Sequence, residues 1–386
     1  MAKDFVYQGQ RIGVVGAGFS GTVLARELAQ AGYLVTLHES RSHIGGNCHT
    51  ERCPQTGVMV HVYGPHIFHT NDAEVWGYAG RFARFRPYCH RVKATAQGRV
   101  FSMPINLHSI NQFFGTSLSP KEAQQFIAAQ AIRGDEAPQN LEEQALSLMG
   151  PALYEAFFKG YTQKQWGCAP SSLPASILQR LPLRFSYDDN YFFHRFQGIP
   201  EDGYTALMGR MLDHPNIDVH LDSLANRDTA RRYDHLFWTG PLDAYFAHSH
   251  GRLGYRTLDF DRFEVEGDGQ GCAVMNYPDA QIPHTRVTEH KHFAPWETHD
   301  RSVLYRETPR YCGVADIPYY PIRLTTEKAL LLTYEHLAAA EGNTRFLGRL
   351  GTYRYLDMDV TIREALDAAR AFLRGQSLAP QLSGAA

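Results

Sequence analysis

Three glycines stand close together near the start of the chain, in the turn Gly16-Ala17-Gly18-Phe19-Ser20-Gly21. A short apolar run, Arg11–Val15, precedes this turn, and a helical pattern follows it to about Gln30. The next apolar run, Leu34–His38, begins soon after Gly32. A strand, a helix and a second strand in this order form a βαβ unit with parallel strands. The chain is therefore expected to begin with a Rossmann-type α/β domain.

The glycines of this turn suit a dinucleotide, because residues without a Cβ let backbone N–H groups approach a pyrophosphate. The N-terminus of the following helix then faces the anion with the positive end of its dipole. Glu39 ends the second strand, 18 residues after Gly21, where a carboxylate can accept hydrogen bonds from the adenosine ribose. A glycine-rich turn without a ligand is the alternative, and the complete strand–helix–strand context disfavours it.

The segments after Glu39 favour FAD over NAD as the dinucleotide. Gly45-Gly46 follows Glu39 after five residues, an arrangement that resembles FAD-binding families of the glutathione-reductase type. The later segments Phe237–Gly240 and Phe346–Arg349 contain predicted strand ends that would close such a site. These segments predict a flavoenzyme. The sequence has no second G-x-G-x-x-G motif for NAD(P)H, so no reductant is expected at a recognisable second Rossmann site.

Beyond this first unit the sequence pattern changes twice. Ser119-Pro120, Asn140 and Pro151 each predict the start of a helix in a block of short helices, and Thr361–Glu364 predicts a capping box for the last helix. Between these blocks, Tyr, Phe, Val and Thr with Gly and Pro turns indicate an antiparallel sheet. The predicted units are a discontinuous FAD-binding domain (1–76, 216–250 and 340–375), a helical domain with a mobile substrate loop (105–180), an antiparallel sheet domain (77–104, 181–215 and 251–335) and a disordered tail (376–386).

Composition and charge exclude several classes of partner. The formal net charge of -2 and the isoelectric point of about 6.8 offer no polyelectrolyte surface for nucleic acid or an acidic membrane. No apolar run is long enough to span a membrane, and the first ten residues lack the apolar core of a secretion signal. The six cysteines are scattered without a C-x-x-C pair. The chain is therefore expected to be cytoplasmic.

Three histidines, His61, His66 and His69, raise the question of a metal site. No carboxylate or cysteine stands near enough in the sequence to complete a ligand set with them. No metal is expected, and packed loop histidines are the simpler interpretation.

Seven further segments, in order along the chain, match one family. They are Gly64–Thr70, Phe157–Thr162, Lys164–Gly167, Tyr187–Tyr191, Thr285–His290, Ile317–Pro321 and Gly348–Asp359. With these segments the chain closely resembles the bacterial UDP-galactopyranose mutase family, from Arg11 to about Leu373. The resemblance implies a Rossmann-type FAD domain with an inserted helical bundle and an antiparallel β-sheet domain.

The resemblance also implies the reaction. The family interconverts UDP-galactopyranose and UDP-galactofuranose with no net oxidation. In this family N5 of reduced FAD attacks the anomeric carbon as UDP leaves, and a covalent flavin–sugar adduct forms before another hydroxyl closes the ring. The protein then mainly binds, orients and neutralises charge. An external reductant such as NAD(P)H, a homodimer and a place in cell-wall polysaccharide biosynthesis are implied as well.

The expected substrate-binding residues follow from the same resemblance. Arg180 and Arg286 match arginines that meet the diphosphate, a task that suits guanidinium groups because they bind phosphate oxygens in a bidentate way. Phe157 and Tyr161, four residues apart on one helical face, match residues that hold the uracil; by pattern alone they would be a core stripe. The other matches are Trp166 beside the sugar, Tyr191, Tyr320 and Tyr355 on the diphosphate, Asn276 at the nucleotide, and Asp357 near the same pocket.

The expected cofactor-binding residues come from four separate segments. They are Gly16, Gly18, Phe19, Ser20, Gly21, Glu39, Ser40, Gly46, Asn47, His66, Ile67, Arg349, Tyr355, Asp357 and Met358. The resemblance places His66 near flavin N5 and the reacting sugar, so Arg180, Arg286 and His66 are the expected catalytic residues. Arg349 is expected on the flavin side, where its charge would favour the anionic reduced form.

Two other activities stay open at this point. A mutase for a related nucleotide sugar, such as UDP-N-acetylgalactosamine, would keep every residue that recognises UDP. An FAD oxidoreductase, such as an amine oxidase or monooxygenase, would share the N-terminal unit but would oxidise its substrate. The arginines and tyrosines expected around the diphosphate argue against the oxidoreductase.

Overall fold

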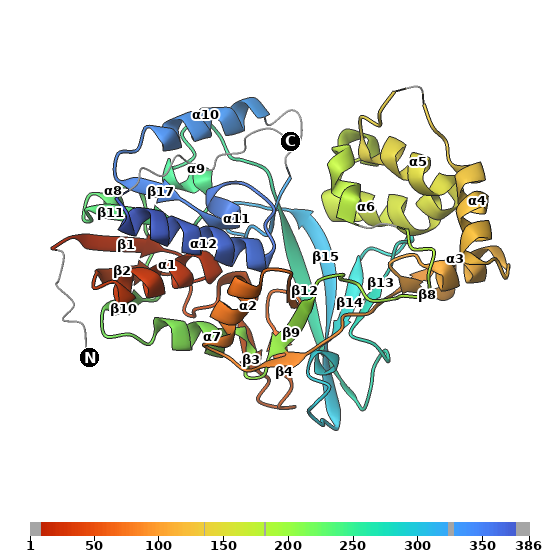
Figure 1. Cartoon of the computed structure of the whole chain (residues 1–386), viewed down its shortest axis with the longest axis horizontal. Helices are drawn as coiled ribbons and strands as arrows, with labels where there is room; N and C mark the ends of the chain where they lie inside the picture. Colours follow the sequence, from red (N-terminus) through yellow and green to blue (C-terminus); the bar gives the residue numbers. More distant parts are fainter. Residues whose placement is uncertain (1–8, 135, 181–182, 323–327, 376–386) are drawn as a thin grey trace.

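A computed structural model describes residues 9–134, 136–180, 183–322 and 328–375. The tail 376–386, expected to be disordered, lies outside this part of the chain, and so does the side chain of Arg180. Figure 1 shows a Rossmann-type unit on one side, a helical unit on the other, and long strands between them.

The Rossmann-type unit is built on a five-stranded parallel sheet with the order β10-β2-β1-β11-β17. The central strand β1 (Arg11–Val15) and its neighbour β2 (Leu34–His38) have the bounds that the sequence predicts. The other strands are β10 (Ile217–His220), β11 (His235–Trp238) and β17 (Thr344–Phe346). The predicted Rossmann-type fold is therefore confirmed, and its sheet is assembled from three distant parts of the chain.

Helices cover both faces of this sheet. On one face α1 (Phe19–Gln30), α7 (Gly203–Leu212) and α12 (Met358–Leu373) share an apolar core with β1 and β2. On the other face α9 (Leu242–Tyr245) and α10 (Lys328–Ala339) pack around Trp238. The sequence placed α7 and most of α10 in segments of the sheet domain, but both helices pack on the Rossmann-type unit.

The last helix begins earlier than predicted. α12 starts at Met358, directly after Asp357, and Thr361 lies in its first turn. The Thr361 hydroxyl donates to the Asp357 carbonyl at 2.9 Å. The capping box predicted for Thr361 and Glu364 is wrong, since Glu364 accepts hydrogen bonds from the guanidinium of Arg354 at 3.0 and 2.7 Å.

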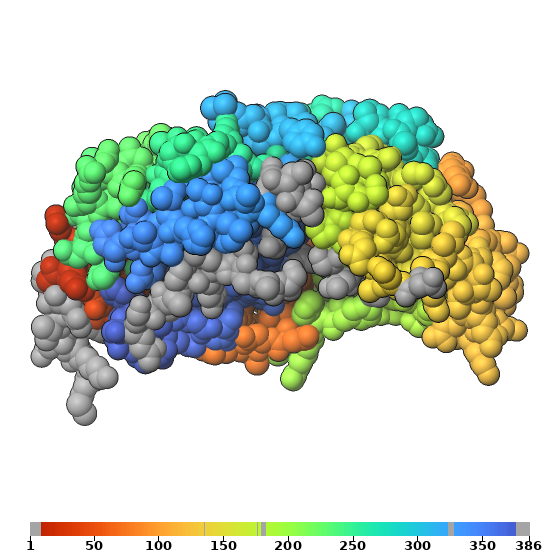
Figure 2. All heavy atoms as spheres, turned by 90° about the horizontal axis from the view of Figure 1, so that it is seen from above, coloured from red at the N-terminus to blue at the C-terminus, as the bar shows by residue number. Residues whose placement is uncertain are grey.

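The helical unit forms the other end of the molecule (Figure 2). It contains α3 (Leu107–Phe114), α4 (Pro120–Gln130), α5 (Leu141–Leu153) and α6 (Gly160–Trp166). As predicted, Ser119 caps α4 and Asn140 caps α5 through side-chain oxygens that accept backbone N–H groups. Gly150 has a φ of 71°, which interrupts α5 just before Pro151. No helix among the described residues is both long and apolar enough to cross a membrane.

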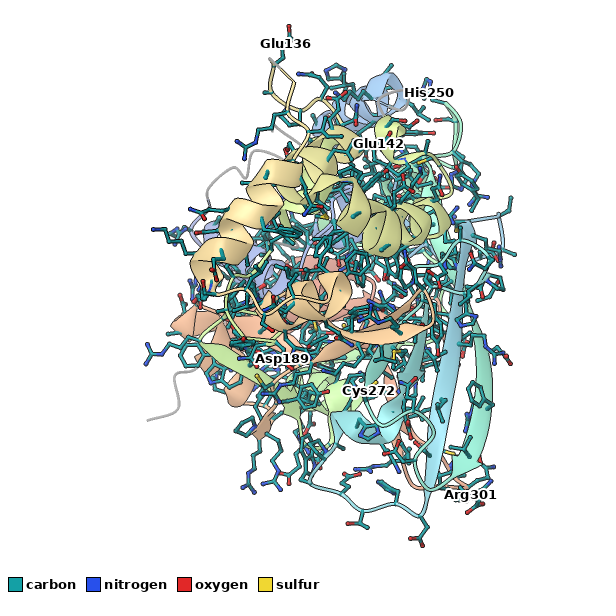
Figure 3. The ribbon with its side chains drawn as sticks, turned by 90° about the vertical axis from the view of Figure 1, so that its right-hand side faces the viewer. Glu136, Glu142, Asp189, His250, Cys272 and Arg301 are labelled. Carbon is teal, nitrogen blue, oxygen red and sulfur yellow. The ribbon has the colours of Figure 1, made fainter. Side chains whose placement is uncertain are left out.

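A seven-stranded sheet joins the two units, with the order β16-β12-β15-β14-β13-β7-β8. Its strands are β7 (Val92–Ala96), β8 (Arg99–Met103), β12 (Tyr255–Glu266), β13 (Val274–Asn276), β14 (Arg286–Glu289), β15 (Arg301–Tyr311) and β16 (Tyr320–Pro321). The β13–β7 pair is parallel, so the sheet is mixed and not wholly antiparallel as predicted. Arg301 marks the far end of the long strands in Figure 3, and Glu136 marks the tip of the helical unit.

A smaller sheet lies beside the Rossmann-type unit. It pairs β5 (Phe68–Thr70) and β6 (Phe85–Pro87) with the two sides of β9 (Phe196–Pro200), all antiparallel. This sheet anchors the loop that carries His66, because β5 begins two residues after it.

Candidate active site

The glycine-rich turn closes tightly before α1. Gly16 has a φ of +97°, a backbone conformation that other residues rarely adopt, and a Cβ there would lie 2.2 Å from Thr239 Oγ1. A Cβ on Gly21 would lie 1.9 Å from the carbonyl oxygen of Gly16. No side chain caps the N-terminus of α1. The turn therefore presents uncapped amides with no side chain in the way, which suits a pyrophosphate.

Glu39 lies at the end of β2 and is only 5% exposed. Its carboxylate accepts hydrogen bonds from the backbone N–H groups of Ala17 at 2.7 Å and Arg41 at 3.0 Å, and from Ser40 Oγ at 3.3 Å. The Arg41 guanidinium in turn donates to Asn47 Oδ1 at 2.7 Å. The structure thus joins Glu39, Ser40 and Asn47 in one hydrogen-bonded group beside the glycine turn.

Two other segments also approach this turn. A Cβ on Gly46 would lie 3.1 Å from the Cα of Gly18. A Cβ on Gly348 would lie 2.5 Å from Ser20 Oγ. Arg349 directly follows Gly348, so the C-terminal segment meets the start of α1 where the sequence places the cofactor.

The loop that carries His66 is fixed by hydrogen bonds. The backbone N–H of His66 donates to His61 Nδ1 at 3.3 Å, and its Nδ1 lies 2.9 Å from the Gly64 carbonyl oxygen. The Tyr204 hydroxyl donates to the His66 carbonyl at 3.0 Å. Burial and the guanidinium of Arg349 lower the pKa of His66 to about 4. His66 is therefore a neutral imidazole near a positive charge at ordinary pH.

Arg286 is the centre of a second polar cluster. Its Nη2 donates to the Tyr161 hydroxyl at 2.8 Å, and its Nε lies 3.6 Å from an oxygen of Glu307. Glu307 is 3% exposed and also accepts from Thr288 Oγ1 at 3.0 Å. Burial lowers the pKa of the Arg286 guanidinium, but Tyr161, Glu307 and Tyr320 outweigh burial and hold that pKa above its ordinary value. A permanent positive charge is thus fixed beside two tyrosines.

Asn276 and Arg286 oppose each other in the β13–β14 pair. Within the described chain, Asn276 Oδ1 and Arg286 Nε are buried side-chain atoms without a hydrogen-bond partner. Such atoms are rare in folded proteins because leaving them unpaired costs free energy. Arg286 Nε faces Glu307, so Asn276 Oδ1 is the acceptor of this pair that suits a ligand donor.

Tyr320 and Tyr355 lie between this cluster and Arg349. Their rings stack with centroids 6.0 Å apart and planes at 17°. The guanidinium carbon of Arg349 lies 4.6 Å from the Tyr355 ring centroid and 6.0 Å from that of Tyr320. Burial and Tyr355 raise the pKa of Tyr320, while Arg286 and Arg349 act to lower it. The charges of both guanidinium groups therefore act on Tyr320.

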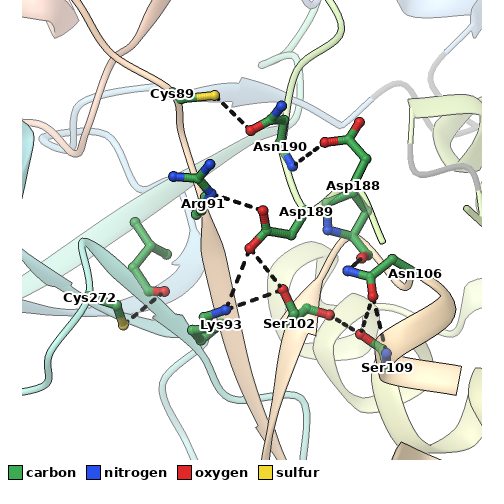
Figure 4. Close-up of polar contacts among 12 residues, drawn as sticks. Cys89, Arg91, Lys93, Ser102, Asn106, Ser109, Asp188, Asp189, Asn190 and Cys272 are labelled. Carbon is green, nitrogen blue, oxygen red and sulfur yellow. Dashed lines mark hydrogen bonds and ion pairs between the residues drawn. The ribbon is translucent and has the colours of Figure 1, made fainter. Parts of the chain in front are cut away.

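The segment that carries Tyr191 is tied to the seven-stranded sheet (Figure 4). Asp189 accepts a hydrogen bond from Arg91 Nε at 2.9 Å, and the backbone N–H of Tyr191 donates to the His90 carbonyl at 2.8 Å. The rings of Tyr191 and His90 meet edge to face at 5.4 Å. His90 in turn feels the charge of Arg286. Tyr191 is thus fixed to His90, two residues before β7.

The described residues hold one group of metal-ligand type, and the three histidines of the sequence prediction are not part of it. That group is Asp268, Glu289 and His292. The carboxylate of Glu289 already accepts the backbone N–H groups of Gly269 at 3.0 Å and Gln270 at 2.8 Å. These bonds give the group a structural role in the turn.

Buried histidines near this site predict sensitivity to acid. Burial and neighbouring charges lower the pKa of His90 and His290 to about 3, and that of His61 well below its ordinary value. Below pH 6.5 these histidines become protonated in the unfolded chain but stay neutral in the folded chain. The free energy of unfolding therefore falls as the pH falls through that value. His90 and His290 should each lower the free energy of unfolding by about 2 kcal/mol at pH 5. We expect a clearly lower urea midpoint at pH 5 than at pH 7.

His290→Gln should weaken this pH dependence, because it removes one buried histidine whose pKa is lowered in the folded chain. His108→Gln is the matched control, since His108 is exposed on α3. Urea unfolding of both variants at pH 7 and pH 5 is the measurement. Equal pH dependence in the two variants would count against this account.

Comparison with known proteins identifies the family. A family model described as UDP-galactopyranose mutase matches residues 156–355. A probable UDP-galactopyranose mutase of Klebsiella pneumoniae is 58% identical, over 94% of this chain and 95% of the relative. The chain belongs to the UDP-galactopyranose mutase family. The resemblance seen in the sequence is therefore confirmed, and the chain is an enzyme of the mutase type, as expected.

A further relative, a solved structure and a domain model also match this member of the UDP-galactopyranose mutase family. A dTDP-fucopyranose mutase of Escherichia coli is 50% identical, over 94% of this chain and 98% of the relative. A crystal structure of reduced UDP-galactopyranose mutase shares the fold, with a TM-score of 0.75, 16% identity and 96% of each chain covered. A model described as an NAD(P)-binding Rossmann-like domain matches residues 14–82. Together they support a flavoprotein-type Rossmann fold.

The site residues expected from the UDP-galactopyranose mutase family differ in their burial and surroundings. Phe157 is 4% exposed and packs edge-on against Phe101 at 5.0 Å, so its ring belongs to an aromatic core, and its place at the uracil stays a prediction. Trp166 is partly exposed at the end of α6. Arg180 ends a short 3-10 helix, Ala175–Arg180, and its role stays a prediction.

Proposed function

We propose that this enzyme interconverts UDP-galactopyranose and UDP-galactofuranose with reduced FAD as nucleophile and without net oxidation. The observation that carries the proposal is a line of four side chains, in which Arg349 lies over the stacked rings of Tyr355 and Tyr320 and the charge of Arg286 acts on Tyr320. This line joins a cluster suited to a diphosphate with the segments that approach the glycine turn. The relatives described as UDP-galactopyranose mutase support the same substrate.

The diphosphate would be met by Arg286. Its guanidinium can form a bidentate pair with phosphate oxygens, and Glu307 holds it in place from the buried side. Asn276 and the hydroxyls of Tyr161 and Tyr320 add donors and acceptors around it. When the bond between sugar and UDP breaks, negative charge grows on the departing phosphate, and a fixed guanidinium stabilises that charge. Arg180 is proposed as a second such group.

FAD would be held by the glycine turn, by Glu39 and by the Gly46 segment. These residues fit a dinucleotide because a Cβ at Gly16 or Gly21 would clash with neighbouring atoms, and because the amides of α1 are uncapped. When bound and reduced, the flavin supplies the nucleophilic nitrogen for the anomeric carbon. Arg349 adds positive charge at this side and so favours an anionic reduced ring.

Neutral His66 would orient the reacting groups without adding a second positive charge. Its pKa of about 4 keeps it uncharged, and its Nδ1 is engaged with the Gly64 carbonyl. The proposal also includes an external reductant such as NAD(P)H and a homodimer, both carried over from the family resemblance.

A second substrate deserves a direct comparison, because a dTDP-fucopyranose mutase is 50% identical to this chain. Reduced enzyme should be incubated separately with UDP-galactopyranose, dTDP-fucopyranose and UDP-N-acetylgalactopyranosamine, and the furanose products separated by chromatography. We expect kcat/KM to be highest for UDP-galactopyranose, by about tenfold or more. Heat release of the cofactor, followed by chromatography, should give FAD. A higher kcat/KM for either of the other two sugars would change the assigned substrate and leave the mutase chemistry in place.

A further inference from the structure

The ammonium group of Lys164 lies inside the hairpin that joins β13 to β14. Its Nζ donates to four backbone carbonyl oxygens of that hairpin. They belong to Tyr277 at 2.5 Å, Asp279 at 2.9 Å, Ile282 at 2.8 Å and His284 at 3.1 Å. An ammonium has three N–H groups, so these four acceptors saturate it. The loop thus encloses the lysine much as carbonyl oxygens enclose a bound cation.

The two ends of this hairpin are site residues. Asn276 is the last residue of β13, Arg286 is the first of β14, and the two residues are paired in register. The N–H of Tyr277 donates to the Thr285 carbonyl at 2.9 Å and closes the loop between them. Any change in the shape of the loop therefore reaches Asn276 and Arg286 within one residue.

The backbone of Lys164 belongs to α6, which lies across the site from the hairpin. Lys164 lies on α6, three residues after Tyr161 and two before Trp166. A Cβ on Gly160 would lie 2.4 Å from the Pro278 carbonyl oxygen, so the first turn of α6 touches the same loop. The Tyr161 hydroxyl then receives its hydrogen bond from Arg286 at 2.8 Å. Helix and hairpin thus meet at three points, and two of these involve a charged side chain, Lys164 and Arg286.

An arginine on β12 fixes the C-terminal end of α6. Arg256, 2% exposed on β12, donates to the carbonyls of Gln165 at 2.8 Å and Lys164 at 2.9 Å. These bonds fix the helix to the sheet, but they leave the hairpin untouched. Among the described contacts, Lys164 is the residue whose side chain donates several hydrogen bonds to the hairpin loop.

We propose that Lys164 is a positioning residue that sets the spacing between Tyr161 on α6 and the Asn276–Arg286 pair, so that one nucleoside diphosphate can contact both. This inference rests on the proposed function for its ligand. Lys164 donates all its hydrogen bonds to backbone carbonyls, so it acts on the ligand through the residues it positions. Its loss should weaken nucleotide binding and leave flavin binding unchanged.

Lys164→Met tests this directly, because methionine keeps the length of the side chain and removes its donors. The four carbonyls then lose their partner, and the hairpin should loosen. We expect amide hydrogen exchange of residues 277–286 to accelerate in the ligand-free variant, and the dissociation constant for UDP, measured by calorimetry, to rise about tenfold or more. The flavin absorbance per mole of protein should match that of the wild type.

Lys159→Met is the matched control. Lys159 lies five residues earlier, and its Nζ pairs with Glu155 at the surface. It should leave both the exchange and the UDP affinity unchanged. Lys164→Gln, which keeps two N–H donors without the charge, should bind UDP with an intermediate affinity, and it carries the test if the methionine variant does not fold.

The outcomes separate this inference from the proposed function. Wild-type affinity and wild-type exchange in Lys164→Met or Lys164→Gln would overturn the role of Lys164 alone. Accelerated exchange without weaker UDP binding would also overturn it, because the hairpin would then not set the ligand site. A wild-type protein that does not bind UDP would overturn both proposals.

Discussion

Arg286→Ala should abolish turnover while the protein keeps its flavin. The substitution removes the guanidinium that is proposed to meet the diphosphate and that holds the Tyr161 hydroxyl. A hydrogen-bonded charge pair in a buried site typically contributes several kcal/mol, so we expect kcat/KM to fall by about a thousandfold or more. Steady-state rates with reduced enzyme, together with the flavin absorbance, are the measurement.

Two further variants make this result specific. Arg286→Ala leaves Glu307 buried and unpaired, which by itself destabilises a protein by about 3–5 kcal/mol. Arg286→Lys keeps a charge for Glu307 but loses the planar fork, so it should fold normally and still lose about a hundredfold in kcat/KM. Arg301→Ala is the control, because Arg301 pairs with Glu264 and Glu266 at the far end of β15 (Figure 3). Normal turnover in Arg286→Lys would contradict the diphosphate assignment.

Gly21→Ala should yield protein without bound flavin. The added Cβ would lie 1.9 Å from the Gly16 carbonyl oxygen and 3.1 Å from a methyl group of Val14. One of these groups must move, and either movement opens the turn that is proposed to hold the pyrophosphate. We expect the flavin-to-protein absorbance ratio of the purified variant to fall by about tenfold or more, with a matching loss of activity.

The same substitution at an open position is the control. Gly77 lies in α2 (Ala73–Gly80), and a Cβ there would meet nothing within 4 Å. Gly77→Ala should keep its flavin and gain about 0.5–1 kcal/mol of stability from helix propensity. Full flavin content in Gly21→Ala would show that the turn is not the binding site.

The parts of the fold that the sequence predicts well depend on neighbours in the chain. The glycine turn, β1, β2 and the caps at Ser119 and Asn140 need only short-range patterns, and the structure confirms them. Packing between distant segments leaves no such pattern. α7 therefore fell in the wrong unit, because the residues it buries lie on α1, far away in the sequence.

In the candidate site, too, local sequence patterns predict some features, and contacts between distant segments decide the others. Phe157 and Tyr161 have the spacing of one helical face, which fits either a core stripe or a binding surface, and the structure places Phe157 in the core. Glu307 was missed altogether, because a lone acidic residue on a strand gives no sign that it will lie beside Arg286. Its signal is the pairing of β14 with β15, where Arg286 and Glu307 are direct partners in register.

Lys164 was present in a matched segment, yet its role needs the folded hairpin. The four carbonyl oxygens around its Nζ come from residues more than a hundred positions later. No side-chain pattern marks them, since backbone carbonyls are common to every residue.

The central claim is that this enzyme isomerises a UDP-sugar with reduced flavin and no net oxidation. Anaerobic incubation of the flavin-loaded protein with UDP-galactofuranose, with and without dithionite, tests it most directly when UDP-galactopyranose is followed by chromatography. The account predicts conversion in the reduced sample and none in the oxidised one. Equal conversion in both samples would contradict the flavin chemistry, and no conversion by folded, reduced, flavin-loaded protein would contradict the proposed reaction itself.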